Sequence, residues 1–394
     1  MHGAPIMDHL KYAATQTKHA ARLPSSWLGA YNHWVLHNAS AVSTVESSIR
    51  SLSYIIPGRF RDAEIASESL NSGVQLLSLY HDALLSRGLR EGVAGRRQHQ
   101  SVHNRYTGYW SRKSGVYRRT AVMLQVVQYT ELLLEMIAKR RGEKARWRVV
   151  VVLEAVKAMC RLILMRMTGA RPGLDPPLPV REPVVPGSKG QASEEGEGFG
   201  SPPSERSEAG SETWTMPRTS LTLPPLPGSE DISSYLLSKV LTADDIKPPK
   251  ALLHRTTGLG ELAEVLYILR PLIYASALAY YSRKSPKGTR DWRPWLLGLS
   301  IEYGARQLAK RDLETRRPGG ARGLTQLERE QLKKRGWNLA WWGMRGAFYE
   351  NVTRGAIQGF ANKLKGKPVL DMVGNIVEDY EFLWETYYFP TATM

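Results

Sequence analysis

The chain has 394 residues, a net charge of +17 at pH 7 and one cysteine, Cys160. A single cysteine excludes a fold stapled by disulfide bonds and favours a reducing compartment. The positive excess, with a pI of about 9.8, predicts an anionic partner, either nucleic acid or a phospholipid surface. The 11 tryptophans and 18 tyrosines greatly outnumber the 6 phenylalanines, and rings with a polar atom are favoured at membrane and protein interfaces.

No secretory signal is expected at the start of the chain, because residues 1–23 are polar and lack an apolar core segment. The last four residues match no organelle address of the lysine-leucine type. A run of roughly eighteen uncharged apolar residues, the mark of a clean membrane span, is also missing from the sequence.

Residues 147–167 and 259–282 come nearest to a membrane span, but charged side chains interrupt both. A charge at the centre of a bilayer costs about 2.5–3.5 kcal/mol on insertion scales. These segments therefore either pack against one another and hide their charges, or lie in the membrane interface. The interrupting charges are Glu154, Lys157 and Arg161 in one segment and Glu261, Glu264 and Arg270 in the other.

Three amphipathic helices are predicted first, over residues 27–37, from Ser40 or Ser43 to Ile56, and over residues 62–84. Their apolar residues recur at steps of three and four, which is the period of one helix face. We expect these helices to bury their apolar faces against each other.

A basic loop with interleaved aromatic side chains is predicted over residues 87–119. Such a loop is compatible with nucleic acid, through phosphate contacts and base stacking, with anionic headgroups, or with simple solvation. Its cations are Arg87, Arg90, Arg96, Arg97, Arg105, Arg112, Lys113, Arg118 and Arg119, and its rings are Tyr106, Tyr109, Trp110 and Tyr117.

Two long apolar helices are predicted next, over residues 116–140 and 143–167. A segment rich in proline, glycine, serine and glutamate follows, and this composition buries too little apolar surface to offset ordering. The sequence therefore predicts an N-terminal part, residues 1–168, a flexible linker, residues 169–250, and a C-terminal part, residues 251–394.

The C-terminal part begins with a predicted helical hairpin, whose legs are residues 259–282 and 292–308. The turn between them contains Pro286 and Gly288 and cannot be helical. Apolar legs with a cationic tip suit a membrane surface, and they suit equally the core of a soluble helical bundle with a solvated tip. The tip cations are Arg283, Lys284, Lys287, Arg290 and Arg293.

A further helix is predicted from Leu324, where Thr325 and Glu328 have the spacing of a capping box. This helix is highly charged at first and then becomes aromatic, with Trp337, Trp341 and Trp342, as a helix does on entering an interface or a protein core. A last helix is predicted over residues 369–389.

No catalytic motif is found in the sequence, and we expect neither an enzyme nor a cofactor. His33 and His37, and likewise His99 and His103, have the spacing of metal ligands on one helix face. Neither pair has a third ligand nearby, so a membrane enzyme built on them is the weakest hypothesis. Cys160 lies on an apolar helix and is expected to be a small core residue.

Three ordered segments resemble the peroxisomal membrane protein 16 (peroxin-16) family of peroxisome biogenesis factors. They are residues 52–60, with the family's Gly-Arg-Phe element, residues 264–272, with Tyr-x-x-Arg-Pro-Leu, and residues 291–297, with Trp-Arg-Pro-Trp. Residues 324–335 and 348–350 are similar in place and order, and the middle insertion is longer than in shorter members.

This resemblance implies a non-catalytic, membrane-bound helical protein of the peroxisome and the endoplasmic reticulum. It implies a receptor or scaffold that docks peroxin-three, the anchor for the import chaperone peroxin-nineteen, and so helps insert peroxisomal membrane proteins. Some fungal-type members are peripheral and linked to peroxisome division, which leaves that role as an alternative. A basic helical protein that binds nucleic acid is the alternative from another class, although no nucleic acid is expected as a partner.

The resemblance and the charge pattern together select the candidate site residues. We expect an all-α, membrane-associated bundle in two halves joined by the linker. The first four arginines of the basic loop are the candidate targeting patch for lipid or an acidic chaperone: Arg87, Arg90, Arg96 and Arg97. The family segments contribute the residues expected to define the fold or a contact: Arg59, Phe60, Arg270, Pro271, Trp292, Pro294 and Trp295.

Overall fold

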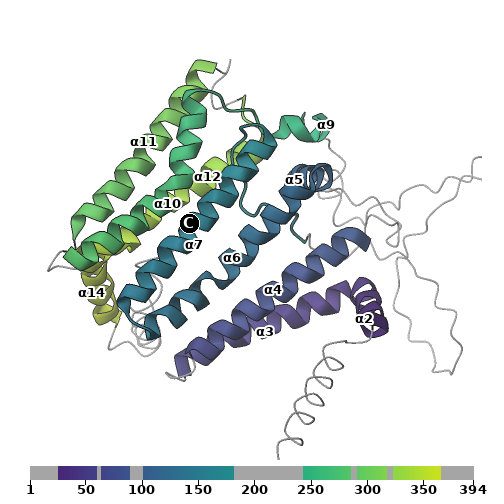
Figure 1. Ribbon diagram of the computed structural model, residues 1–394, viewed down its shortest axis with the longest axis horizontal. Coiled ribbons are helices and arrows are strands. Elements are labelled where there is room, and N and C mark those ends of the chain that lie inside the picture. The colour runs from purple at the N-terminus through teal and green to yellow at the C-terminus, as the bar shows by residue number, and fades with distance from the viewer. Residues whose placement is uncertain are drawn as a thin grey trace, which may run out of the picture. The chain divides into compact units, whose positions relative to one another are not determined.

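The computed structural model describes residues 25–59, 64–88, 101–181, 243–284, 291–316 and 323–364, and every regular element in these ranges is a helix (Figure 1). The all-α fold expected from the sequence is confirmed. The chain divides into two compact units. One comprises Met1–Glu182 with Leu253–Met394, and the other comprises Pro183–Leu252. In the smaller unit the described elements are α9 (Ala243–Ile246) and the 3₁₀ turn η2 (Pro249–Leu252).

The larger unit begins with α2 (Ser25–His37), α3 (Ala39–Arg59) and α4 (Glu64–Gly88), close to the three amphipathic helices predicted. Next come α5 (Val102–Lys113), α6 (Gly115–Arg140) and α7 (Glu143–Thr168). Helix α7 ends at Gly169, which adopts a left-handed backbone with φ 72°. Glycine takes this conformation without steric cost, which explains why the helix stops there.

The basic loop predicted over residues 87–119 is wrong from Val102 onward, because α5 and the start of α6 occupy this stretch. Ser101 and Ser114 cap the two helices, their side chains accepting hydrogen bonds from the amides of Asn104 and Tyr117. The aromatic residues recur at helical spacing and face inward. Composition suggested a loop, whereas the spacing of the rings indicates a helix.

The C-terminal part begins with the predicted hairpin, α10 (Leu259–Lys284) and α11 (Trp292–Arg316). Helix α12 (Gln326–Ala340) follows with the predicted capping box, in which Thr325 and Glu328 each accept a hydrogen bond from the other's backbone amide. The chain continues as η5 (Trp341–Met344), α13 (Gly346–Phe348), the π-helical η6 (Tyr349–Thr353) and α14 (Arg354–Leu364). The helix predicted over residues 369–389 lies outside the described residues.

Six long helices lie in one row, in the order α3, α4, α6, α7, α10 and α11, and each contacts the next (Figure 1). The contact between α7 and α10 joins sequence segments from before and after the smaller unit. Ala158 and Met165 of α7 and Ile268 of α10 form the buried apolar cluster at this contact. Burial of this apolar surface is what holds the N-terminal and C-terminal helices together.

The beginning of the predicted linker, residues 169–181, packs instead against α5 and α6. The Tyr117 hydroxyl donates to the Pro177 carbonyl at 3.1 Å, and a ring nitrogen of His103 lies 3.0 Å from the Pro176 carbonyl oxygen. Asn104 exchanges two hydrogen bonds with the backbone of Val180, at 2.7 and 2.8 Å. Composition predicted too little burial to order this stretch, but these helices supply the partners that its backbone needs.

Two glycines of α11 give a matched test of how tightly the hairpin packs. A Cβ atom at Gly298 would overlap the Trp342 ring, whereas one at Gly304 would meet nothing within 4 Å. We expect Gly298→Ala to lower the free energy of unfolding, because overpacking costs about 1–3 kcal/mol. Gly304→Ala should raise it by up to about 1 kcal/mol, the helix-propensity difference between the residues. Chemical unfolding followed by circular dichroism measures both, and equal effects would contradict the packing described.

Candidate membrane and partner interface

A buried aromatic cluster joins the hairpin to the aromatic segment that follows α12. Trp295 of α11, Trp342 of η5 and Tyr274 of α10 lie in it, each less than a tenth exposed. The Trp295 indole nitrogen donates to the Trp342 carbonyl at 3.0 Å. The Trp295 ring also stacks on Phe348, with centroids 5.4 Å apart. Within the aromatic stretch of the sequence, Trp342 therefore enters a protein core and fixes η5 on the hairpin, whereas Trp337 and Trp341 are exposed.

A buried ion pair lies beside this cluster. Arg270 of α10 is 1 % exposed, and its guanidinium lies 2.6 Å from a carboxylate oxygen of Glu302 on α11. The Trp342 indole donates to the same carboxylate. One carboxylate thus holds α10, α11 and η5 together. Because both charges are removed from water, each depends on the other for compensation.

A second buried carboxylate, Glu264 of α10, is paired with Arg335 of α12. Arg335 donates two hydrogen bonds to Glu264, at 2.5 and 2.8 Å, in the bidentate arrangement that suits a guanidinium. Its guanidinium also lies 4.3 Å from the Tyr267 ring centroid. Burial alone would lower the pKa of Arg335, but the Glu264 carboxylate outweighs it and raises the pKa above its ordinary value. Arg335 therefore stays charged.

The charges of α7 are paired in a similar way. The Lys157 ammonium is 2.7 Å from Glu154 and 2.5 Å from Glu131 of α6. Burial raises the pKa of Glu154, and Lys157 counteracts that shift. Arg161 lies 3.5 Å from Asp175. The apolar segments thus pack together and hide most of their interrupting charges, which is the first of the two alternatives predicted; Glu261, in the first turn of α10, is exposed.

Two described helices, α6 and α10, are long and apolar enough to cross a membrane by length and composition. From the sequence, the segments nearest to a membrane span were residues 147–167, which lie in α7, and residues 259–282, which lie in α10. Helix α7 is not apolar enough to cross a membrane, because Glu154, Lys157 and Arg161 lie within its apolar run. The charges of α6 lie mainly near its ends. In α10, half of the most apolar window is buried inside the protein.

The exposed end of the hairpin carries aromatic, apolar and cationic side chains together, and we call it the tip surface. Tyr280 is 54 % exposed and Leu296 is equally exposed. The Lys284 ammonium lies 5.3 Å from the Tyr280 ring centroid, and the Arg293 guanidinium lies 5.8 Å from that of Tyr281. Such a mixture is typical of side chains at a membrane–water interface. The tip surface comprises Tyr280, Tyr281, Arg283, Lys284, Trp292, Arg293 and Leu296.

The aromatic residues that suggested nucleic-acid binding lie in the core. Tyr106, Trp110 and Tyr117 are 2 %, 5 % and 3 % exposed, and the Trp110 ring lies 6.5 Å from the Tyr117 ring. Bases stack only on exposed rings. Burial of these three rings removes base stacking as a support for the nucleic-acid hypothesis, which rested also on the high pI and on the arginines of residues 87–119.

The predicted site residues fall into two groups. Four of the hairpin residues, Arg270, Pro271, Pro294 and Trp295, are buried within the chain, whereas Trp292 is 38 % exposed. The remainder are not described at the level of side chains. Arg59 and Arg87 fall within the bounds of α3 and α4, and Phe60, Arg90, Arg96 and Arg97 lie outside the described residues.

The histidine pairs gather no further ligands among the residues that the structure describes. The rings of His33 and His37 are 4.1 Å apart, but the nearby polar group is the His33 carbonyl, 2.8 Å from His37 Nδ1. His99 is not described. Within the described ranges, no three histidine, cysteine, aspartate or glutamate side chains are grouped to hold a metal ion.

Glu302 and Arg335, which pair with Arg270 and Glu264 of α10, were not among the predicted residues. Their signal in the sequence is indirect: a carboxylate and a guanidinium within an apolar helix need buried partners. Which helix supplies each partner depends on how the helices cross, and the spacing of residues along one helix does not contain that information.

These features define a class: a helical protein whose apolar helices neutralise their charges internally and whose hairpin ends in a surface suited to a membrane. The comparisons agree with this class. Residues 29–386 match the family described as peroxisomal membrane protein (Pex16). The chain therefore belongs to the Pex16 family of peroxisomal membrane proteins, which act in peroxisome biogenesis.

Curated relatives extend over most of the chain. The peroxisomal membrane protein PEX16 of Schizosaccharomyces pombe is 23 % identical over 318 residues, covering 79 % of this chain and 83 % of the relative. The peroxisome biogenesis protein 16 of Arabidopsis thaliana is 22 % identical over 371 residues, covering 86 % and 93 %. The peroxisome biogenesis factor 16 of Dictyostelium discoideum is 30 % identical over 132 residues, covering 33 % and 30 %. No solved structure matches the chain significantly.

Proposed function

We propose that this protein is a non-catalytic membrane receptor of peroxisome assembly, acting at the peroxisomal and endoplasmic reticulum membranes. It docks peroxin-three, the anchor for the chaperone peroxin-nineteen, and so helps recruit and insert peroxisomal membrane proteins. The match of residues 29–386 to the family carries this proposal. The pairing of Glu264 and Arg270 of α10 with residues of α12 and α11 supports it, because a helix whose charges are paired within the protein can leave water at lower cost.

The tip surface supplies the membrane contact in this proposal. Its cations lie at an anionic headgroup layer, where each contributes about 1 kcal/mol, and its rings lie at the boundary with the acyl chains. Arg87, Arg90, Arg96 and Arg97 remain the proposed targeting patch, for acidic lipid or for an acidic surface of peroxin-nineteen. Buried Arg270 and Trp295 hold the hairpin in shape and leave the outward contact to the tip surface.

Reversing two tip charges tests the membrane contact. We expect Arg283→Glu with Lys284→Glu to weaken binding to vesicles of phosphatidylcholine and phosphatidylserine by about 30-fold or more, from the loss of two favourable cations. Vesicle flotation of the purified chain measures this binding. The matched control is Arg329→Glu with Lys333→Glu, two exposed cations of α12. Equal losses in the two variants would contradict a specific role for the tip surface.

Recruitment of peroxin-three tests the receptor role itself. In cells that lack their own family member, the intact chain is expected to bring labelled peroxin-three to peroxisomal and endoplasmic reticulum fractions and to restore peroxisomes. Alkaline carbonate extraction of the same membranes reports how the chain is held. Restored peroxisomes without peroxin-three recruitment would overturn the docking role, and complete release by carbonate would support a peripheral regulator of peroxisome division.

A further inference from the structure

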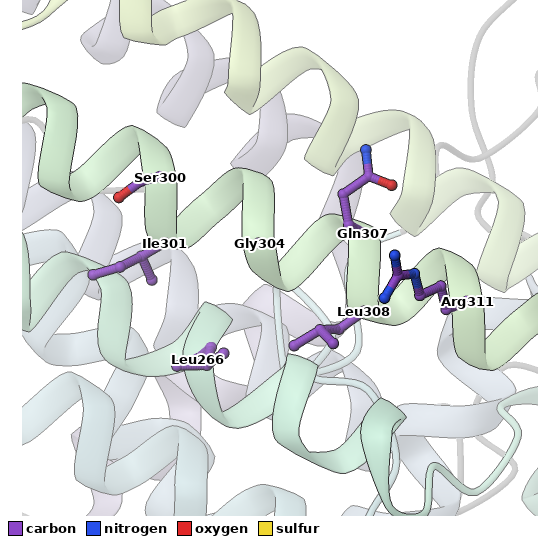
Figure 2. Close-up of a pocket in the computed structure, with 7 residues that line it drawn as sticks. All are labelled: Leu266, Ser300, Ile301, Gly304, Gln307, Leu308 and Arg311. Carbon is purple, nitrogen blue, oxygen red and sulfur yellow. The ribbon is translucent and has the colours of Figure 1, made fainter.

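An open groove of about 380 Å³ lies between α10 and α11 (Figure 2). Leu266 of α10 and Ile301 and Leu308 of α11 form apolar walls, and Gly304 lies between the two α11 residues. Gln307 and Arg311 supply polar groups at one end of the groove. The groove is distinct from the tip surface, because its residues lie farther from the hairpin turn on both helices.

We propose that this groove binds one acyl chain of an anionic phospholipid, with the Arg311 guanidinium on the lipid phosphate. The volume falls in the range of small-ligand sites, roughly 300–1,000 Å³. From Ile301 to Arg311 the helix rises about 15 Å, at about 1.5 Å per residue. An acyl segment laid along α11 therefore reaches from the apolar walls to the cation.

The distribution of polarity selects a lipid as the occupant. Between Ser300 at one end and Gln307 and Arg311 at the other, the groove walls are apolar, and the charged group in the lining is Arg311. This distribution matches a molecule with an apolar tail and one anionic head. A guanidinium binds phosphate oxygens in a bidentate manner. A peptide in the same place would need hydrogen-bond partners along its backbone, and the apolar walls offer none over most of the length.

The absence of a side chain at Gly304 forms the part of the groove that the acyl chain occupies. A Cβ atom built at Gly304 meets nothing within 4 Å, so the absence of a side chain leaves open space between Ile301 and Leu308. The apolar surface continues along the same face of α10 to Leu262, four residues before Leu266, which is 48 % exposed. An acyl chain covers this exposed apolar strip, which would otherwise face water.

Filling the groove with a larger side chain at position 304 is the first test. The purified full chain in detergent is mixed with phosphatidylserine, and lipid retained per protein is measured by native mass spectrometry. We expect Gly304→Leu to weaken retention by about tenfold or more, because the new side chain displaces methylene groups of the lipid. Gly73→Leu is the matched control, since Gly73 of α4 is another helical glycine with open space.

Leucine favours the helix over glycine, so Gly304→Leu is expected to remain folded. Circular dichroism confirms that the variant keeps its helical content. Wild-type protein that retains no phospholipid, or equal retention by wild type and Gly304→Leu, would overturn the proposal.

The charge at the end of the groove is the second test. Arg311→Glu is expected to lower retention of phosphatidylserine by about tenfold. Lys310→Glu, an equal charge change at the preceding exposed residue, is expected to leave retention near that of wild type. Equal losses in the two variants would show a general electrostatic attraction and overturn the contact with Arg311. Neither vesicles nor peroxin-three are present, so this result is independent of the proposed receptor function.

Discussion

Replacing Glu302 by alanine is expected to lower the free energy of unfolding by about 3–5 kcal/mol, the cost of removing one member of a buried ion pair. The substitution leaves Arg270 with an uncompensated charge at 1 % exposure. It also removes the acceptor of the Trp342 indole hydrogen bond. Chemical unfolding of the purified chain in detergent, followed by the helical circular dichroism signal, measures the loss.

Two companion variants separate loss of the pair from general damage to α11. Glu314→Ala removes an exposed carboxylate of the same helix, 3.8 Å from Lys310, and is expected to cost about 0–1 kcal/mol. Arg270→Leu combined with Glu302→Leu removes both charges and should recover most of the stability, since apolar replacements of a buried pair are often neutral. A double variant as unstable as Glu302→Ala would show that the unpaired charge is not the cause.

Replacing Trp342 by alanine is expected to lower the free energy of unfolding by about 3–5 kcal/mol, the range for deleting a buried large aromatic side chain. Trp342 is 2 % exposed and packs edge-on against Tyr274 and Trp295, with ring centroids 5.2 and 6.2 Å away. The substitution opens a cavity between the hairpin and η5.

Trp337 gives a matched control for this change, because it lies five positions earlier and is 67 % exposed. Trp337→Ala is expected to change stability by less than about 0.5 kcal/mol, as surface substitutions usually do. Both variants replace a tryptophan by an alanine in the same part of the chain, so they differ mainly in the burial of the tryptophan. Similar losses in both variants would contradict the burial of Trp342.

The hairpin and the long helices were predictable because their signals are local. Pro286 and Gly288 separate two apolar runs, and the spacing of Thr325 and Glu328 is itself the capping motif. Each signal lies within a few residues and depends on backbone chemistry that any surrounding fold shares. These predictions therefore held, including the pairing of α10 with α11.

The partners of the buried charges were not predictable from local signals. Glu264 and Arg270 were identified as charges that interrupt an apolar helix, but their partners, Arg335 and Glu302, lie on other helices. The groove at Gly304 was missed for the same reason, since open space beside a glycine depends on the neighbouring helix. The basic loop was wrong because composition was weighed above the helical spacing of Tyr106, Trp110 and Tyr117.

The pairing of α10 with later helices has a consequence for how the nascent chain behaves on the ribosome. Arg335 follows Glu264 by 71 residues, and Glu302 also follows Arg270, so α10 emerges before either counter-charge has been synthesised. During that interval Glu264 and Arg270 lack the partners that they have in the folded protein. The hairpin therefore has both counter-charges only after α12 has been translated, which favours folding of the completed chain over folding helix by helix.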